Sequence, residues 1–79
     1  MALSPGNVVR LIETRVSVAG GRTTEFAQGL VGRVCKVSES GSGFCCVQFP
    51  SRCQRVHENF LERTTGAAPR CEEGCKSGC

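Results

Sequence analysis

The segment over residues 29–49 constrains the fold most, because it holds two apolar stretches separated by a run of small residues. Residues 31–37 (VGRVCKV) and 44–49 (FCCVQF) are rich in valine, cysteine and phenylalanine, which suit a pleated and half-buried strand. Between them, residues 38–43 (SESGSG) supply glycines that can adopt positive φ and serines that form local hydrogen bonds. We therefore predict a β-hairpin at the centre of the chain.

The part before this hairpin contains shorter strand signals. Residues 8–12 (VVRLI) form an apolar run and residues 15–18 (RVSV) alternate polar and apolar side chains, which predicts one kinked strand or two short ones. Residues 19–24 (AGGRTT) are predicted to form a loop, because a glycine pair is the most flexible dipeptide. Gly29 and Gly32 flank the entry to the next strand, which indicates a tight bend or a close approach of two backbones.

The part after the hairpin predicts one more strand and a short turn. Pro50 cannot continue a central ladder, so the preceding strand should end there. Residues 52–56 (RCQRV) alternate in polarity as a final strand would. Residues 57–62 (HENFLE) fit a single helical or 3-10 turn that returns Phe60 and Leu61 to the core.

The composition changes at the C-terminal end. Residues 66–79 contain glycine, alanine, proline, cysteine and charged residues but no large apolar side chain, so they are not expected to join a core. We predict an all-β fold over residues 1–65, a small SH3-like β-barrel of about five short antiparallel strands with one 3-10 turn, followed by a flexible C-terminal tail over residues 66–79. An OB-type barrel is the second interpretation, since it normally needs more residues and a longer helix.

A chain of 79 residues makes one small domain. Such a chain buries only about 60% of its extended surface, so a partner, a metal or disulfides should help to stabilise it. No run approaches the ~20 apolar residues of a membrane span, and the first 20 residues lack the apolar region of a secretory signal. These features predict a soluble, intracellular domain.

Seven cysteines would indicate a disulfide framework in a secreted chain of this size. Because no secretory signal is found, we interpret most cysteines of residues 1–65 as small buried hydrophobic residues. Cys45 and Cys46 are adjacent, so their side chains should point to opposite faces of a strand and not serve one site.

The residues do not predict an enzyme. The chain has one histidine, His57, and no aspartate, so a Ser-His-Asp arrangement cannot form within it. A nucleophilic pair of Cys53 and His57 is conceivable but carries little weight. Phosphate-binding loops, dinucleotide fingerprints and paired acidic motifs are missing from the sequence. We expect a non-catalytic chain.

The tail cysteines Cys71, Cys75 and Cys79 are spaced four apart, which would align them on one helical face. Gly74 and Gly78 disfavour a stable helix there, and no CxxC pair of the kind common in zinc sites occurs. A metal site with a fourth ligand from elsewhere and a disulfide within the tail are the two alternatives to a flexible, reducible tail, which we favour.

The net charge of +3 resides in the body of the chain, where residues 1–65 carry eight Lys and Arg against five Glu. Nucleic-acid binders usually show a denser basic stripe with aromatic platforms. This mild excess suits an acidic protein partner at least as well.

The order of several short motifs resembles that of the variable chain of ferredoxin–thioredoxin reductase. The matching stretches are residues 5–11 (PGNVVRL), 15–18 (RVSV), 24–26 (TEF), 29–34 (GLVGRV), 47–49 (VQF) and 57–62 (HENFLE). The resemblance implies an SH3-like barrel without a cofactor. Such a barrel braces a catalytic chain whose iron–sulfur cluster and redox disulfide perform the chemistry.

Two other photosynthetic barrels are similar to this sequence. The PsaE-type stromal subunit of photosystem I shares the opening motif, a Gly-x-Val strand, a Val-x-Phe strand and a late Asn59-Phe60 pair. The ferredoxin-docking NdhS-type subunit of the photosynthetic dehydrogenase complex shares the run over residues 29–34. The sequence departs from the reductase chain by shorter loops, from the PsaE type by a longer segment after Arg10, and from all three by the cysteine tail.

These resemblances imply a barrel subunit of a photosynthetic electron-transport complex that stabilises or docks acidic ferredoxin, with the iron–sulfur cluster in a partner. The reductase variable chain is the first interpretation and the PsaE-type photosystem I subunit the second. The implied location is the chloroplast stroma, the stromal face of the thylakoid, or the cyanobacterial cytoplasm. The side chains expected to contact the partner are Arg10, Arg33, Lys36, Arg52, Arg55 and His57.

An adaptor of the KOW or Tudor type, which binds RNA or a peptide, is the alternative from a different class. The chain has no Tyr and no Trp. Those residues commonly form the cages and stacking platforms of such adaptors, so we rank this class lower.

Overall fold

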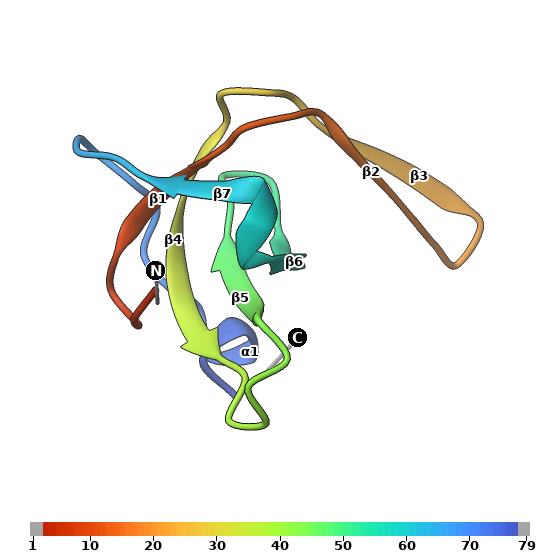
Figure 1. Cartoon of the computed structure of the whole chain (residues 1–79). Helices are drawn as coiled ribbons and strands as arrows, with labels where there is room; N and C mark the ends of the chain where they lie inside the picture. The colour runs from red at the N-terminus through yellow and green to blue at the C-terminus, as the bar shows by residue number, and fades with distance from the viewer. Residues whose placement is uncertain (1–2, 78–79) are drawn as a thin grey trace.

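The computed structural model describes residues 3–77 and consists mainly of antiparallel β-strands (Figure 1). No helix among these residues is long and apolar enough to cross a membrane. The predicted all-β class is confirmed. The elements in chain order are β1 (Val8–Leu11), β2 (Arg15–Ala19), β3 (Arg22–Phe26), β4 (Val31–Val37), β5 (Phe44–Gln48), β6 (Cys53–His57), the 3-10 turn η1 (Glu58–Phe60), β7 (Leu61–Arg63) and the single-turn helix α1 (Glu73–Lys76).

The strands form two sheets, one of five strands and one of two. The five-stranded sheet has the order β6-β5-β4-β1-β7, and β2 and β3 pair only with each other. Within the described part of the chain, β6 and β7 are the outer strands of the larger sheet, so it is open and not a closed barrel. In Figure 1 the β2–β3 hairpin extends away from the rest of the molecule.

The central hairpin predicted over residues 29–49 is confirmed. Strands β4 and β5 pair antiparallel, with Val34 opposite Val47. The register shifts between Val34 and Lys36, which marks a bulge that bends β4. Gly41 and Gly43 in the connecting loop adopt φ of 75° and 85°, as the small-residue run indicated.

The loop predicted over residues 19–24 is wrong, because these residues belong to the β2–β3 hairpin. Ala19 pairs with Arg22, so only Gly20 and Gly21 turn the chain. Their φ values of 59° and 78° are both positive, as a two-residue type I′ turn requires. The glycine pair is thus the tight turn of a hairpin, and the following threonines lie in strand β3.

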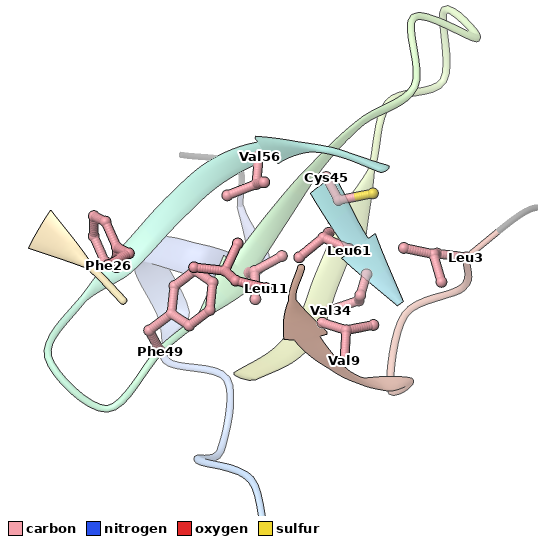
Figure 2. Packing of buried hydrophobic residues seen from close by; sticks show 10 residues of the cluster. Leu3, Val9, Leu11, Phe26, Val34, Cys45, Phe49, Val56 and Leu61 are labelled. Atoms are coloured by element: carbon pink, nitrogen blue, oxygen red, sulfur yellow. The ribbon is translucent and has the colours of Figure 1, made fainter. Parts of the chain in front are cut away.

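The core lies between the two halves of the bent five-stranded sheet and the base of the hairpin (Figure 2). Phe26 and Phe49 are its largest side chains, and their ring centroids lie 5.2 Å apart. Burial of each large apolar side chain contributes roughly 1.5–3 kcal/mol. The buried cluster consists of Leu3, Val9, Leu11, Phe26, Val34, Cys45, Val47, Phe49, Val56 and Leu61. A cluster of this size is small for a stable domain.

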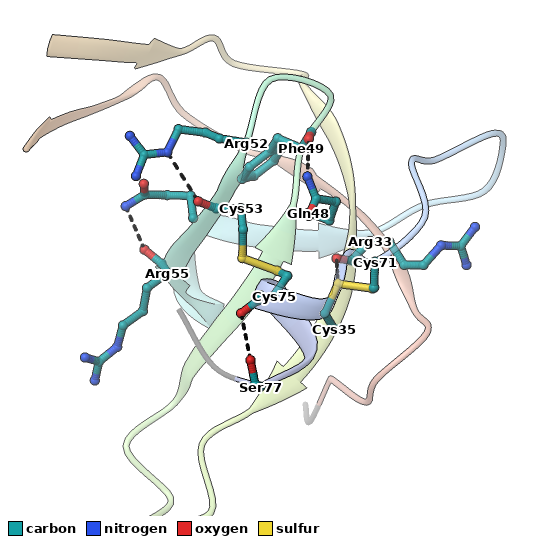
Figure 3. The surroundings of a disulfide bond; sticks show 12 residues. Arg33, Cys35, Gln48, Phe49, Arg52, Cys53, Arg55, Cys71, Cys75 and Ser77 are labelled. Atoms are coloured by element: carbon teal, nitrogen blue, oxygen red, sulfur yellow. Dashed lines mark hydrogen bonds between the residues drawn. A yellow bond between two sulfur atoms is a disulfide. The ribbon is translucent and has the colours of Figure 1, made fainter. Parts of the chain in front are cut away.

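Within residues 3–77, two disulfides join the C-terminal segment to the larger sheet (Figure 3). Cys71 bonds to Cys35 of β4, and Cys75 bonds to Cys53 of β6. Helix α1 contacts β4, β5 and β6, and Cys75 is only 1% exposed.

The segment therefore packs on the sheet, and the expectation that it stays apart from the core is wrong. Its attachment comes from sulfur and not from large apolar side chains, which composition alone does not reveal. One polar contact adds to the crosslinks, because Arg33 Nε donates to the carbonyl of Pro69. Arg33 Nη1 donates to the carbonyl of Gly6, which precedes β1. The predicted flexible tail is instead attached covalently to the sheet at Cys71 and Cys75.

The interpretation of the body cysteines as buried hydrophobic residues holds for Cys45 alone. Cys45 is a free, buried thiol. Cys35 and Cys53 form the two crosslinks, and Cys46 is also disulfide-bonded. The absence of a secretory signal was a poor guide to the oxidation state of the cysteines, since the C-terminal segment packs on the sheet and brings its sulfurs to those of β4 and β6.

The crosslinks generate a prediction about stability. Replacing Cys35 and Cys71 together by Ala, or Cys53 and Cys75 together by Ala, should each lower the free energy of unfolding by about 3–4 kcal/mol in urea titrations. The loops that they close span 36 and 22 residues in sequence separation, so the first pair should cost slightly more. Cys45→Ala is the control that leaves the crosslinks intact. Unchanged urea midpoints after full reduction would contradict this role.

Among the glycines of residues 3–77, Gly32 is the one at which a Cβ atom would meet core side chains. A Cβ atom there would lie 2.7 Å from Val47 Cγ1, 2.8 Å from the Gln48 carbonyl oxygen and 2.9 Å from Phe49 Cδ1. The close approach indicated by the sequence is confirmed at this position.

Gly32→Ala should therefore destabilise the domain by about 1–3 kcal/mol or more, because β5 has to move to admit the methyl group. Gly74→Ala is the matched control, since a Cβ atom at Gly74 meets no atom within 4 Å. Its expected change is below about 1 kcal/mol. Equal urea midpoints for the two variants would refute the packing argument.

Candidate functional site

A groove of about 380 Å³ separates the β2–β3 hairpin from β6 and η1. We call it the hairpin groove. Among residues 3–77 its lining contains two arginines and the histidine but no carboxylate, so the fixed charge of these lining residues is positive. The lining residues are Arg15, Val16, Ser17, Phe26, Phe44, Gln54, Arg55, Val56, His57, Asn59 and Phe60.

His57 lies between two phenylalanine rings on the sheet side of the groove. Its ring centroid is 5.0 Å from that of Phe44 in an edge-on arrangement and 6.4 Å from that of Phe60. The Asn59 backbone N–H donates to Nδ1, so Nε2 carries the proton and donates to the Ser42 carbonyl. Both nitrogens are 3.1 Å from their partners. These two bonds select one neutral tautomer and fix the orientation of the ring.

Two arginines stack on the aromatic rings. The Cζ atom of Arg15 is 4.0 Å from the centroid of Phe60, and that of Arg55 is 4.5 Å from the centroid of Phe44. Stacking over an aromatic face attracts a guanidinium and restricts its motion while its N–H donors stay accessible at the edge. The two side chains are therefore partly organised before any ligand arrives.

The two arginines differ in their carboxylate neighbours. Arg15 Nη1 lies 3.6 Å from Oε1 of Glu13, an exposed pair that contributes little to stability. In the part of the chain that the structure describes, no carboxylate lies within ion-pair distance of Arg55. Arg55 thus offers its donors to an anionic group from outside the chain.

Apolar side chains are exposed beside these charges. Val16 is 58% exposed and Val18 is 71% exposed on β2, and Phe44 is 37% exposed at the start of β5. Exposed apolar residues that lie together mark interaction sites more often than scattered ones. The groove and the hairpin therefore combine apolar contact area with positive charge.

Two of the residues predicted from the sequence to contact a partner, Arg55 and His57, line this groove. Lys36 lies beside them, in a smaller hollow of about 130 Å³ that it shares with Phe44 and Arg55. Lys36 and Arg55 form one basic surface around Phe44.

The other three predicted contacts lie elsewhere and have neighbours within the chain. Arg10 of β1 forms an ion pair with Glu62 of β7. Arg33 holds the C-terminal segment, and Arg52 Nε donates to the Cys53 carbonyl in the turn before β6. The structure does not bring these side chains together with Arg55.

Arg15 is a groove residue that was not predicted from the sequence as a site residue. The stacking of Arg15 on Phe60 joins the start of β2 to η1, two elements far apart in the chain. The alternating pattern of residues 15–18 predicts the strand, but it does not show which surface the arginine of this strand faces. Only the position of the hairpin beside η1 brings the pair together.

The cysteines do not form a reactive or metal-binding centre among residues 3–77. Burial, with a smaller contribution from the charge of Glu58, raises the pKa of the Cys45 thiol, so it stays protonated at neutral pH. Cys53 cannot act with His57 as a nucleophile, because its sulfur is bonded to Cys75.

The expected metal ligands are accounted for in part. Cys71 and Cys75 both form disulfides and so cannot bind a metal as thiolates, and Cys79 lies outside the described residues. Within residues 3–77 no group of three His, Cys, Asp or Glu side chains is arranged to hold a metal ion.

Comparison with known proteins finds no match to this chain among protein-family models, curated proteins or solved structures.

The anchoring of His57 can be tested through the loop that supports it. In Gly43→Ala the new Cβ atom would lie 2.6 Å from His57 Nε2, so the ring has to move. Gly41→Ala is the matched control, because both glycines have positive φ but nothing lies near a Cβ atom at Gly41. We expect changed NMR shifts for the rings of His57, Phe44 and Phe60 in Gly43→Ala alone. Identical spectra of the two variants would show that the loop does not position the ring.

Proposed function

We propose that this chain is a non-catalytic binding domain that docks an acidic protein partner in the hairpin groove. The observation that carries the proposal is the pair of guanidinium groups of Arg15 and Arg55, each stacked on a phenylalanine in a groove to which the described residues contribute no carboxylate. Arginine in such a setting binds carboxylates through its fork of N–H donors.

The charges and the apolar residues have separate parts in this docking. Positive charge around the groove speeds the encounter with an anionic protein and makes the association rate depend on salt. Phe44, Val16 and Val18 supply the apolar area that lowers the dissociation rate once the two proteins touch. The proposal needs no catalytic group from this chain.

An SH3-like barrel is the proposed fold type. It is supported by the order of elements, in which a long hairpin follows the first strand and the 3-10 turn precedes the last. Strand β1 pairs with both β4 and β7, so the first and last strands along the chain lie side by side. The open side of this arrangement is where the hairpin groove lies.

The proposed partner is ferredoxin or another component of a ferredoxin-linked photosynthetic complex, with the iron–sulfur cluster in that partner. Support comes from the resemblance to the variable chain of ferredoxin–thioredoxin reductase, which we rank first, and to the PsaE-type photosystem I subunit. An acidic protein such as ferredoxin suits the positive groove electrostatically.

The proposed location, the chloroplast stroma, the stromal face of the thylakoid or the cyanobacterial cytoplasm, rests on the same resemblance. Disulfides persist mainly in oxidising compartments, so two crosslinks weigh against it unless they resist the local thiol pool. Alkylation of free thiols before extraction measures this directly. If both crosslinks stay oxidised in a reducing compartment, the disulfides are compatible with the proposed location.

The adaptor class that binds RNA or a peptide through an aromatic cage is less well supported. A cage or a stacking platform needs open aromatic faces. Arg15 and Arg55 already cover one face each of Phe60 and Phe44, and His57 packs against the edges between them.

The proposal predicts the effect of neutralising the groove. Arg15→Gln and Arg55→Gln should each lower the association rate with ferredoxin about threefold to tenfold at low salt, and less at high salt. Arg22→Gln, on the exposed β3 strand, is the control with the same change in net charge. Stopped-flow mixing with the coloured ferredoxin reports the rate.

If all three variants lose the same fraction of the association rate, net charge alone explains the effect, and the groove is not the docking site. Absence of any association with ferredoxin or with the catalytic reductase chain at millimolar concentration would overturn the ferredoxin-linked partner.

A further inference from the structure

The hairpin groove is bounded on one side by a strand edge that no other strand of the described residues covers. Strand β6 is the last strand of the five-stranded sheet, and four of its residues, 54–57, line the groove. An uncovered edge presents backbone N–H and C=O groups that can pair with another chain.

The ladder shows which groups of β6 face outward. The Phe49 N–H donates to the Arg52 carbonyl and the Glu58 N–H to the Gly43 carbonyl, at the two ends of the β5–β6 pairing. Because antiparallel bonds alternate, the backbones of residues 54 and 56 face β5, and those of Cys53, Arg55 and His57 face away from it.

Side-chain contacts agree with this assignment. The carbonyls of Cys53 and Arg55 accept hydrogen bonds from the side chains of Arg52 and Gln54, each at 3.3 Å (Figure 3). These donors belong to the preceding residue in each case, and the bonds are long. The outward carbonyls of β6 thus accept hydrogen bonds from neighbouring side chains, and a backbone N–H of an incoming strand can displace these donors.

From this edge and its charges we infer that the hairpin groove receives an extended acidic segment of the partner, which adds as a strand to β6. Arg55 on β6 and Arg15 across the groove meet its carboxylates, and Val16 of β2 meets its apolar side chains. Side chains of an extended strand alternate between two faces, so acidic and apolar residues should alternate in the segment.

The inference rests on the proposed function and deepens it, since it names the form of the partner's binding element. It goes beyond charge attraction between folded surfaces, because backbone hydrogen bonds to Arg55 and His57 are required. A basic segment is disfavoured by the two guanidinium groups, and a wholly apolar one leaves them without a counter-charge.

The test uses the full, disulfide-bonded chain and a capped seven-residue peptide of alternating Glu and Val. We expect the backbone amide signals of Arg55 and His57 to shift on titration and to exchange more slowly with solvent. Arg15→Gln and Arg55→Gln should weaken binding about fivefold or more, whereas Arg22→Gln should not. Glu13→Gln should strengthen binding, because it removes the carboxylate that competes for Arg15.

Two N-methylated peptides isolate the backbone bonds. One carries the methyl groups on every Val nitrogen and the other on every Glu nitrogen. A strand added to one edge uses the N–H groups of alternate residues only, so one of the two peptides should lose binding and the other should keep it. A peptide of alternating Lys and Val controls for apolar contact and should not bind.

The outcomes separate the inference from the function on which it rests. Equal binding of both N-methylated peptides, or binding of ferredoxin without binding of the acidic peptide, overturns strand addition and leaves acidic docking in place. Failure of both ferredoxin and the acidic peptide to bind overturns the proposed function itself.

Discussion

The covalent attachment of the C-terminal segment to the sheet is the constraint on which the rest of this small structure depends. The core holds about ten side chains, and only two of them are aromatic. A domain of this size gains little from burial once the entropy of ordering its chain is subtracted. By linking β4 and β6 to the same short segment, the crosslinks hold in place the two strands that flank β5. The edge of β6 that borders the hairpin groove is thereby kept in place.

The groove follows from this frame and from two local devices. The Gly20-Gly21 turn lets β2 and β3 form a hairpin that reaches past the sheet, which brings Arg15 over η1. On the other side, the two hydrogen bonds of His57 orient the ring that separates Phe44 from Phe60. Rigid aromatic residues with arginines stacked on them form a surface that loses little entropy on binding.

The sequence predicted the all-β class, the central hairpin and the 3-10 turn, because each has a local signal. Valine-rich strands around a small-residue loop, and a polar run before Phe60 and Leu61, are patterns that neighbouring residues alone determine. The β2–β3 hairpin was missed because a glycine pair serves equally as a flexible loop or as a two-residue turn, and only the register of its flanks distinguishes them. The crosslinks, the stacking of Arg15 and the gathering of groove residues depend on contacts between distant segments. For the same reason, only two of the six predicted contact residues, Arg55 and His57, line the groove.

The burial of Cys45 has a consequence for the lifetime of the fold. Its thiol lies next in sequence to the disulfide-bonded Cys46 and is kept protonated by its apolar surroundings. Thiol–disulfide exchange needs an accessible thiolate, so in the native domain this sulfur cannot attack the crosslinks. Unfolding exposes it within reach of several disulfides, where it can initiate scrambling into non-native pairs. Burial of Cys45 in the native core therefore protects the crosslinks from exchange. Prolonged unfolding at alkaline pH becomes irreversible, because the exposed thiolate then attacks them.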